Sequence, residues 1–481
     1  MIDKYYNGVI EQVVSGIGNV EHNSILVRYS NDFSIWDLES VNHYKDQSDI
    51  FFTCHEFSYN KIAEAYEPYL GLIRQMFHRY CSGTLEEFME ECDVYKLQRP
   101  VFESYFEKGF CERTEQILID EVEYEQERMR NSIVTMLQKL SEIRPVVIVL
   151  NRFQLASKST MQLSNSLLQV KNKNIGIVLG VNDVQSIPEF AHEEWDAICE
   201  SMDDRNMVYH IGNAGRNMEP DVMDYYSDYE SDDGYRKLNN LVYFLDFDQA
   251  DHHLSKIERR IKFDNFTISE KKHYQLLLLQ IMVSVLQRDI AKALESCEDL
   301  EKLQDQEKEG AFYYNFWMAT SYMYLGKLEE AMIYVQKAKE CGEALGDDFL
   351  VFRAELLKAQ NQMSGWCNIF FCAQDIEISD KLIEKLNAYH YKNHLAHIYI
   401  YAYDNKPEIV AKAYRSEAFL IYFSKGVALA KEIGNEQLIS IAYRKNIMIA
   451  STNGEYEVSL LYSIRTYEAM KDVDSVEGVR I

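Results

Sequence analysis

The sequence has few residues that interrupt helices, with 6 prolines and 20 glycines among 481 residues. Positive charge is also scarce: the formal net charge is −27, which disfavours broad contact with phosphate backbones or anionic membranes. No apolar run approaches the roughly 18–20 residues that a membrane helix needs. The first residues lack the basic region and apolar core of a signal peptide. These absences predict a mostly helical cytoplasmic protein, with neither nucleic acid nor membrane among the partners of this region.

Paired cysteines are absent as well. The nine cysteines are scattered and never spaced C-x-x-C, which is typical of reduced thiols in a cytosolic protein. The chain is 47% hydrophobic and long enough for two or three domains, each with its own core.

Three short apolar runs, rich in β-branched residues, predict buried parallel strands at 24–28, 146–150 and 175–179. An amphipathic helix with Ile35, Leu38 and Val41 is expected after the first run. Helical patterns also precede Pro145 and separate the last two runs, and 84–87 reads as a capping box. Strands that alternate with helices predict an α/β layer with these three strands at its centre.

The pattern changes near residue 220. Residues 221–235 carry six acids, four tyrosines and no base, as expected of a solvated linker, with an acidic docking motif as the alternative. Beyond them only helical patterns remain. We therefore predict an α/β domain over 1–218, an acidic linker over 219–236 and an all-α region over 237–481.

The all-α region contains a repeat of the tetratricopeptide (TPR) type. Its clearest unit has small and aromatic residues at the TPR offsets: Ala319, Tyr322, Gly326, Ala331 and Ala338. Weaker copies of parts of this pattern surround Ala293, Gly434 and Gly454. The region is therefore predicted to be a TPR-like α-solenoid.

The order of these parts resembles the STAND class of P-loop NTPases, and more narrowly the nucleotide-binding and TPR regions of large bacterial signalling regulators. In that class the strand corresponding to 146–150 ends in two acids, followed by a characteristic segment and a leucine-rich helix. This sequence resembles that segment and helix at Gln154, Ala156, Ser159, Leu163 and 167–168. The resemblance implies a P-loop-NTPase-like parallel sheet, TPR repeats and a downstream output domain, either DNA-binding or a diguanylate cyclase.

The chemistry of that class is missing. A phosphate-binding loop has the pattern G-x-x-x-x-G-K-[ST], whereas residues 29–44 contain no Gly, Lys or Arg. Asn151 and Arg152 stand where acids would hold Mg²⁺, and a neutral amide is a poor ligand or base. The third strand continues as 180–183 without the arginine of the class. We predict an ordinary turn after Tyr29, with no catalytic residue, no cofactor and no metal.

Two other residue sets have the spacing of possible sites. His390, His394 and His397 have helical metal-binding spacing, but Tyr391 replaces the glutamate of H-E-x-x-H, so surface or groove histidines are favoured. An aromatic set could line a peptide groove, although its spacing favours the repeat core. The set comprises Tyr313, Tyr314, Phe316, Trp317, Tyr322 and Tyr324.

The sequence favours a non-catalytic signalling scaffold, a pseudo-NTPase domain joined to a TPR-like solenoid that binds a protein or peptide. Asn315, Met318 and Tyr322 lie along the first helix of the best repeat and are the candidate peptide contacts. An active NTPase switch with an unorthodox loop and a simple TPR adaptor are the alternatives. Because no capping repeat follows the last helical pattern, we expect the chain to be part of a longer protein.

Overall fold

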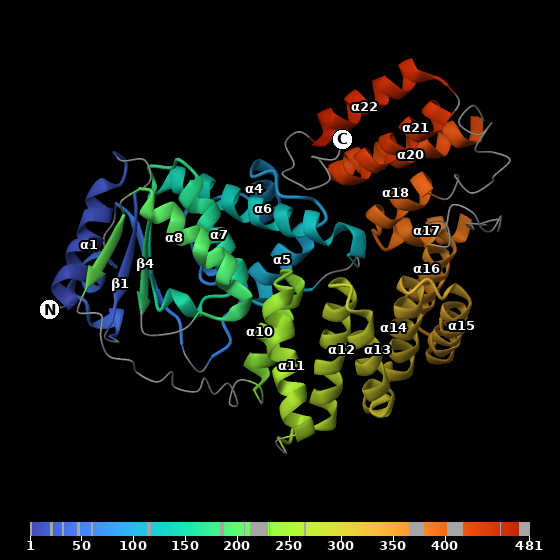
Figure 1. Cartoon of the computed structure of the whole chain (residues 1–481), viewed down its shortest axis with the longest axis horizontal. Helices are drawn as coiled ribbons and strands as arrows, with labels where there is room; N and C mark the ends of the chain where they lie inside the picture. Colours follow the sequence, from blue (N-terminus) through green and yellow to red (C-terminus); the bar gives the residue numbers. More distant parts are fainter. Residues whose placement is uncertain are drawn as a thin grey trace. The chain divides into compact units, whose positions relative to one another are not determined.

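Figure 1 shows the structure, a computed structural model. It describes residues 2–19, 23–30, 33–45, 49–58, 61–112, 117–182, 187–205, 207–211, 229, 231–263, 266–364, 380–401, 417–452 and 454–470. Contacts divide the chain into two compact units. The first comprises Met1–Val94, Gln98–Glu112 and Gln126–Phe266, and the second Tyr95–Leu97, Arg113–Glu125 and Thr267–Ile481.

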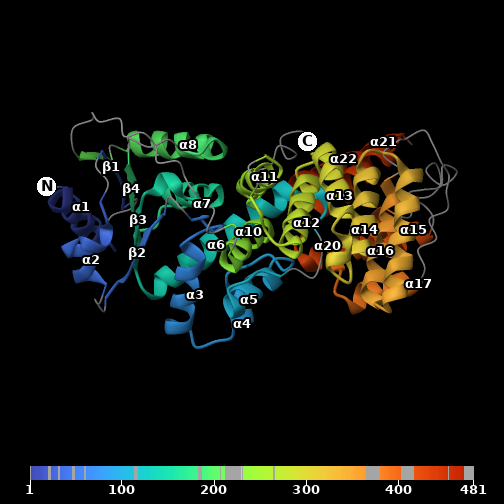
Figure 2. The same ribbon diagram turned by 90° about the horizontal axis from the view of Figure 1, so that it is seen from below.

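A five-stranded parallel sheet in the order β2-β3-β4-β1-β5 forms the centre of the first unit (Figure 2). Its strands are β1 (Ser24–Tyr29), β2 (Phe51–Glu56), β3 (Val146–Asn151), β4 (Ile175–Asn182) and β5 (Val208–Ile211). The predicted strands are confirmed as β1, β3 and β4, the three central ones. The edge strands β2 and β5 have no counterpart in the prediction, because β2 mixes apolar and polar residues and β5 has only 4 residues.

Helices cover both faces of the sheet, with α1 and α2 on one face and α6, α7 and α8 on the other (Figure 2). Tyr6, Ile10 and Val13 of α1 share one hydrophobic core cluster with Val149 and Val178 of the sheet. The helical elements up to β5 are α1 (Ile2–Gly16), η1 (Ile35–Asp37), α2 (Glu39–Tyr44), α3 (Tyr69–Tyr80), α4 (Leu85–Glu91), α5 (Arg99–Lys108), η2 (Ile119–Glu121), α6 (Val122–Ile143), η3 (Phe153–Leu155), α7 (Lys158–Gln169), η4 (Glu189–Ala191) and α8 (His192–Asp203). Of these, η2 and residues 122–125 of α6 belong to the second unit.

The predicted helix after β1 is shorter than expected and split. Ser34 caps the single 3₁₀ turn η1, and Leu38 then adopts an extended backbone before α2 begins. Leu38 has no exposed surface, so the break places its side chain in the core. The predicted capping box is confirmed at α4, where Thr84 and Glu87 bond reciprocally.

Two helices that follow β5 also group with the first unit, α10 (Asp232–Tyr243) and α11 (Phe247–Phe263). Residues 232–236, which the prediction includes in the linker, are the start of α10, whose N-cap is Ser231. Arg236 bonds Glu64 Oε1 at 2.8 Å and the Gly109 carbonyl at 3.1 Å. These polar contacts tie α10 to the unit. The acidic residues 221–228 and Glu230 lie outside the described residues.

The second unit consists of helices that pack against their neighbours in sequence, notably α14 with α15, α15 with α16 and α21 with α22. Its remaining helical elements are α12 (Glu270–Leu286), α13 (Ile290–Glu301), η5 (Gln304–Gln306), α14 (Gly310–Tyr324), α15 (Leu328–Leu345), α16 (Asp348–Ser364), α17 (Asp380–Ala388), α18 (Lys392–Tyr401), α20 (Glu417–Ile433), α21 (Glu436–Thr452) and α22 (Tyr456–Met470).

The small residues of the predicted repeat lie where these helices meet. Ala319 of α14 and Ala331 of α15 are fully buried, and Gly326 turns the chain between the two helices with φ +72°, a conformation that glycine adopts at little cost. The predicted fold class, a parallel-sheet α/β part followed by an all-α solenoid, is thus confirmed. Among the described residues, none of the helices has the length and apolar character needed to cross a membrane.

Candidate functional site

The carboxyl edge of the sheet is the place where open parallel sheets bind ligands. Strand β1 lies between β4 and β5, so connections from β1 and β4 leave in opposite directions and create a topological switch point. The strands end there at Tyr29, Asn151 and Asn182. The site expected from the resemblance would therefore lie at this edge.

Asn151 is fully buried at the end of β3, and its amide is used within the protein. The Tyr29 hydroxyl donates to its Oδ1 at 2.7 Å. Its Nδ2 donates to the Phe33 carbonyl and to Glu56 Oε2, each at 3.3 Å. The amide therefore fastens the segment after β1 to the end of β3.

Glu56, the last residue of β2, supplies the anion at this edge. Arg152 lies 3.0 Å from its Oε1, while the Ile35 amide and the Ser34 hydroxyl donate to its Oε2 at 2.9 and 3.3 Å. A backbone amide of the segment after β1 thus binds a carboxylate of the protein itself. An arginine-paired carboxylate beside neutral amides is also a poor set of Mg²⁺ ligands.

Aromatic side chains fill the space beside this network. Phe33 packs edge-to-face with Tyr6 and Tyr29, with ring centroids 5.1 and 4.8 Å apart. A Cβ at Gly180 of β4 would lie 2.8 Å from Asn151 Oδ1 and closer still to the Tyr6 hydroxyl, so glycine is needed there for packing. Side chains occupy this edge, and the segment described around η1 makes an ordinary capped turn. Asn31, Asp32 and Asp183 lie outside the described residues.

Residues in and beside the segment that resembles the STAND class make contacts within the first unit. Gln154 is fully buried, and its Oε1 accepts a hydrogen bond from the Asn182 amide at 3.3 Å. Ser157 caps α7, and the Ser159 amide donates to Asp246 Oδ2 at 2.8 Å. These contacts link the end of β4 and the start of α7 to neighbouring parts of the first unit.

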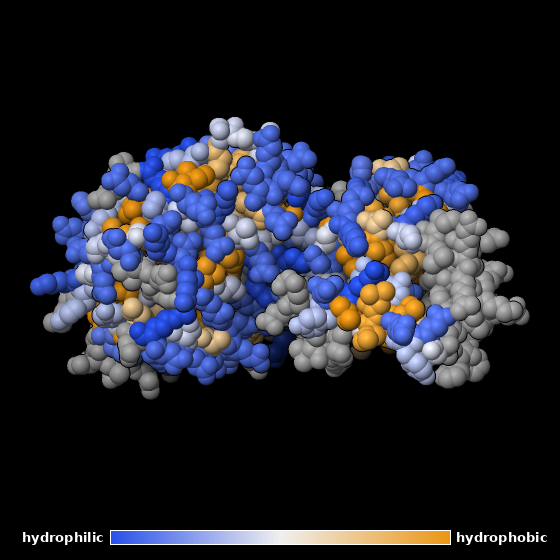
Figure 3. Space-filling model, turned by 90° about the horizontal axis from the view of Figure 1, so that it is seen from above, coloured by the Kyte–Doolittle hydropathy of each residue, from blue (hydrophilic) through white to orange (hydrophobic). Residues whose placement is uncertain are grey.

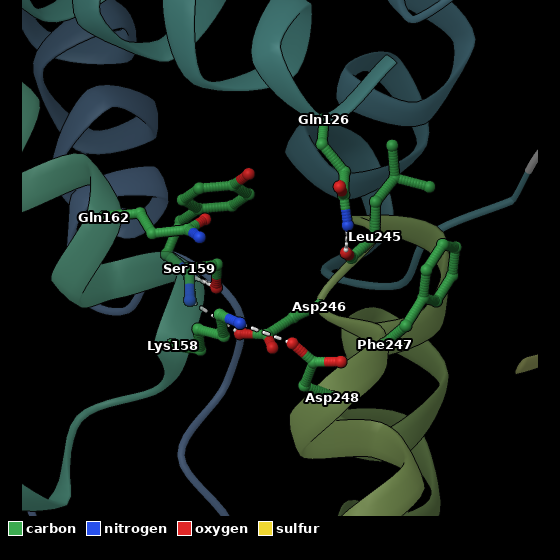
Figure 4. A pocket seen from close by; sticks show the side chains of 9 residues that line it. Gln126, Lys158, Ser159, Gln162, Leu245, Asp246, Phe247 and Asp248 are labelled. Carbon is green, nitrogen blue, oxygen red and sulfur yellow. Dashed lines mark hydrogen bonds and ion pairs between the residues drawn. The ribbon is translucent and has the colours of Figure 1, made fainter. Parts of the chain in front are cut away.

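A small polar pocket lies at the start of α7 (Figure 4). Its volume is about 70 Å³, room for a few water molecules and far less than a nucleotide needs. Lys158 lies 2.5 Å from Asp248 and 3.5 Å from Glu194. Asp246 is 4% exposed, and its Oδ1 has no hydrogen-bond partner among the described residues. Burial raises the pKa of Asp246 to about 6, although the bonds from Ser159 oppose that rise.

The three histidines do not share a helix face as their spacing suggested. His390 precedes α18 with φ +60°, because α17 ends at Ala388 and a turn separates the two helices. His394 packs on the Tyr391 ring, and His397 lies 3.0 Å from Glu121. Within the described residues, no three His, Cys, Asp or Glu side chains gather as a metal site would require.

The candidate peptide contacts on α14 differ in exposure. Asn315 and Met318 are 7% and 6% exposed, and Asn315 Nδ2 donates to the Ala311 carbonyl. Tyr322 is half-buried, stacks on Tyr334 with ring centroids 5.6 Å apart and has Lys327 beside its ring. Of the three, Tyr322 presents the most surface to a ligand. Phe316 and Trp317 of the aromatic set belong to the repeat core.

Sequence reasoning did not find Glu56 or Asp246. Glu56 ends a strand that was not predicted, and Asp246 lies between two helices of a region predicted to be only repeats. The turn between α10 and α11 places Leu245 at φ +67°, and a leucine in that position does not indicate a turn in the sequence. Both carboxylates acquire their contacts from segments distant in the chain.

No protein-family model matches the sequence, and the curated proteins searched contain no match. Among solved structures, the chain is similar to a crystal structure of a STAND protein with a tetratricopeptide repeat sensor from Pyrococcus horikoshii. The match has 11% identity and a TM-score of 0.35, and covers 93% of this chain and 81% of the other. This level of similarity is too low to assign an activity.

We predict that Glu56→Gln lowers the free energy of unfolding of the first unit by about 2–4 kcal/mol, because it removes the negative charge 3.0 Å from the largely buried Arg152. Urea denaturation measures this loss, and hydrogen exchange should show earlier opening of residues 33–38. Glu39→Gln is the matched control, since Glu39 is exposed on α2 and should change stability by less than about 0.5 kcal/mol. Equal effects of the two substitutions would contradict the structural role of Glu56.

A second prediction concerns pH. The pKa of Asp246 is about 6 in the folded protein against an ordinary 3.8, so the folded state binds the proton more tightly and loses stability as the pH rises from about 4 to about 6. Asp246→Asn removes this loss. Its stability relative to wild type should therefore increase by up to about 3 kcal/mol between pH 4 and pH 7.

Urea denaturation at several pH values measures this difference. Asp204→Asn, at an exposed carboxylate, serves as the control and should leave the pH profile unchanged. A wild-type-like profile for Asp246→Asn would show that this carboxyl group titrates normally.

Proposed function

We propose that this chain is a non-catalytic signalling scaffold, in which a STAND-like α/β part without nucleotide chemistry accompanies TPR-like helices that bind a protein or peptide. The observation that carries the first half is the occupied sheet edge: Glu56 satisfies an amide of the segment where a phosphate would bind, and Phe33 fills the adjacent space. A cytoplasmic location and a downstream output domain in a bacterial regulator belong to the same proposal.

The helical unit supports the second half. Its helices present side chains on a rigid scaffold, as peptide-binding solenoids do. Tyr322 is partly exposed on α14, and α22 exposes a set of apolar side chains (Figure 3). The most exposed of them are Tyr456, Leu460, Leu461, Ile464 and Tyr467. The high net negative charge favours a basic or mixed partner at most of this surface.

Nucleotide binding separates this proposal from the active-switch alternative. Isothermal titration with ATP and GTP, with and without Mg²⁺, should detect no binding at about 0.1 mM nucleotide. A variant with glycines and a lysine introduced into 30–37 should still lack ATPase activity, because Asn151 is a poor Mg²⁺ ligand. Micromolar affinity in the unmodified chain would overturn the pseudo-NTPase assignment.

Partner binding is tested with Tyr322→Ala in the intact chain. Capture of partner proteins should fall at least about tenfold, and the binding that remains should weaken as salt rises. Asn315→Ala extends the test, with circular dichroism to detect any loss of folding from this buried site. Leu325→Ala, at the residue that follows α14 and is 46% exposed, is the matched control and should leave capture unchanged. If Tyr322→Ala binds the same proteins as Leu325→Ala and the unmodified chain, the contact assignment on α14 is wrong.

A further inference from the structure

A short segment that ends in the first turn of α6 groups with the helical unit, although the chain on both sides of it groups with the first unit. Residues 113–125 belong to the second unit, and the structure describes 117–125 of them. Within this segment Glu121 is 1% exposed and Ile119 is 6% exposed. A carboxylate this deeply buried needs specific partners.

Three side chains of the helical unit bind the Glu121 carboxylate, and we name them the carboxylate-binding cluster: Asn393, His397 and Asn435. Asn393 Nδ2 donates to Oε2 at 2.7 Å, and Asn435 Nδ2 donates to Oε1 at 2.9 Å. His397 Nε2 lies 3.0 Å from the same Oε1. Both carboxylate oxygens are therefore bound by donors from the region of α18 and α21.

The helices hold much of this cluster in place independently of Glu121. Asn393 and His397 are one turn apart on α18. The Leu438 amide donates to Asn435 Oδ1 at 2.8 Å, and Asn435 Nδ2 also bonds Asn393 Oδ1 at 2.9 Å. Donors fixed by their own scaffold are a feature of a binding site, because little ordering is then needed when the ligand arrives.

A second anchor lies three residues after Glu121. The Tyr124 hydroxyl donates to Glu436 Oε2 at 2.5 Å and lies 3.1 Å from the Gly434 carbonyl. The Tyr124 ring packs edge-to-face with Tyr95. The Glu121 carboxylate and the Tyr124 hydroxyl thus bond the repeat region as the side chains of a bound peptide would.

The electrostatics agree with this geometry. Burial by itself would raise the pKa of Glu121, but His397, Asn435 and Asn393 outweigh it and hold that pKa below its ordinary value. The cluster is therefore suited to an ionised carboxylate, despite the acidity of the chain as a whole.

We infer that α18 and α21 form a binding surface for an acidic peptide segment, and that residues 117–125 of this chain occupy that surface as an internal ligand. This inference rests on the proposed protein-binding role of the repeats. A partner that presents a glutamate and an aromatic residue three positions later would compete with Glu121 and Tyr124. Because residues 117–125 are covalently part of the chain, their effective concentration at this surface is about millimolar. Such a partner therefore binds only when its affinity is high or when the internal segment is displaced.

The probe is a fluorescein-labelled peptide with the sequence RTEQILIDEVEYE, copied from 113–125. Fluorescence anisotropy measures its binding to the intact chain and to the intact chain with Glu121→Gln, after circular dichroism shows that each is folded. The Glu121→Gln chain should bind the peptide at least about tenfold more tightly than the unmodified chain, because its internal ligand is weakened. Glu123→Gln, at an exposed neighbour, is the matched control and should behave as the unmodified chain.

Two changes test recognition of the carboxylate itself. A peptide with glutamine at the position of Glu121 should bind the Glu121→Gln chain at least about tenfold more weakly, and so should the original peptide when Asn393→Ala is added to that chain. If Glu121→Gln does not fold, hydrogen exchange on the unmodified chain replaces it. Excess unlabelled peptide should then increase deuterium uptake in the chain's own residues 117–125.

The inference is overturned if the peptide binds neither folded chain, if glutamate and glutamine peptides bind equally, or if excess peptide leaves the exchange of 117–125 unchanged. The partner-capture experiment with Tyr322→Ala reports on another helix. If the peptide experiments fail but Tyr322→Ala still reduces capture of partner proteins, only the internal-ligand inference is wrong. The proposed function is wrong only if Tyr322→Ala leaves capture unchanged.

Discussion

The arrangement of the α/β unit depends on one constraint: a largely buried anion at the carboxyl edge of the sheet must be neutralised where parallel strands end. Glu56 provides the anion, and Arg152 and the Ile35 amide provide the opposing charge and hydrogen bond. Removing a charge from water is costly unless it is paired and hydrogen-bonded. The turn after β1, the end of β2 and the left-handed Arg152 are therefore held together by the same carboxylate.

The helical unit contains a related arrangement. Glu121 is buried among amides and an imidazole, and it fixes a segment that comes from the first half of the chain. In both units a glutamate satisfies donors that an external ligand could otherwise approach. The donors differ between the two sites. Those of Glu56 include the backbone amide of Ile35, in a segment where Phe33 packs against Tyr6 and Tyr29. Those of Glu121 are side chains at α18 and at the start of α21 that also bond one another or the helix backbone.

The central strands were predictable because continuous β-branched runs are typical of strands buried on both faces. The edge strand β2 was not, since the run from Phe51 to Glu56 mixes apolar and polar residues. Missing β2 also concealed Glu56, the residue that fills the sheet edge. The repeat helices were found from small residues at fixed offsets, such as Ala331, whereas the break between α17 and α18 at His390 was not.

The sequence by itself determined the strand and helix patterns, the absence of glycine and lysine from residues 29–44, and the presence of Asn151 and Arg152 at the end of a central strand. These properties are local, because they follow from residue type and spacing along one segment. Only the tertiary structure decided which groups these residues contact. Glu56 reaches the loop after β1 through strand order, and Glu121 reaches Asn393 and Asn435 across more than half of the chain. Such contacts depend on packing between distant segments, which leaves no periodic signal in a single sequence.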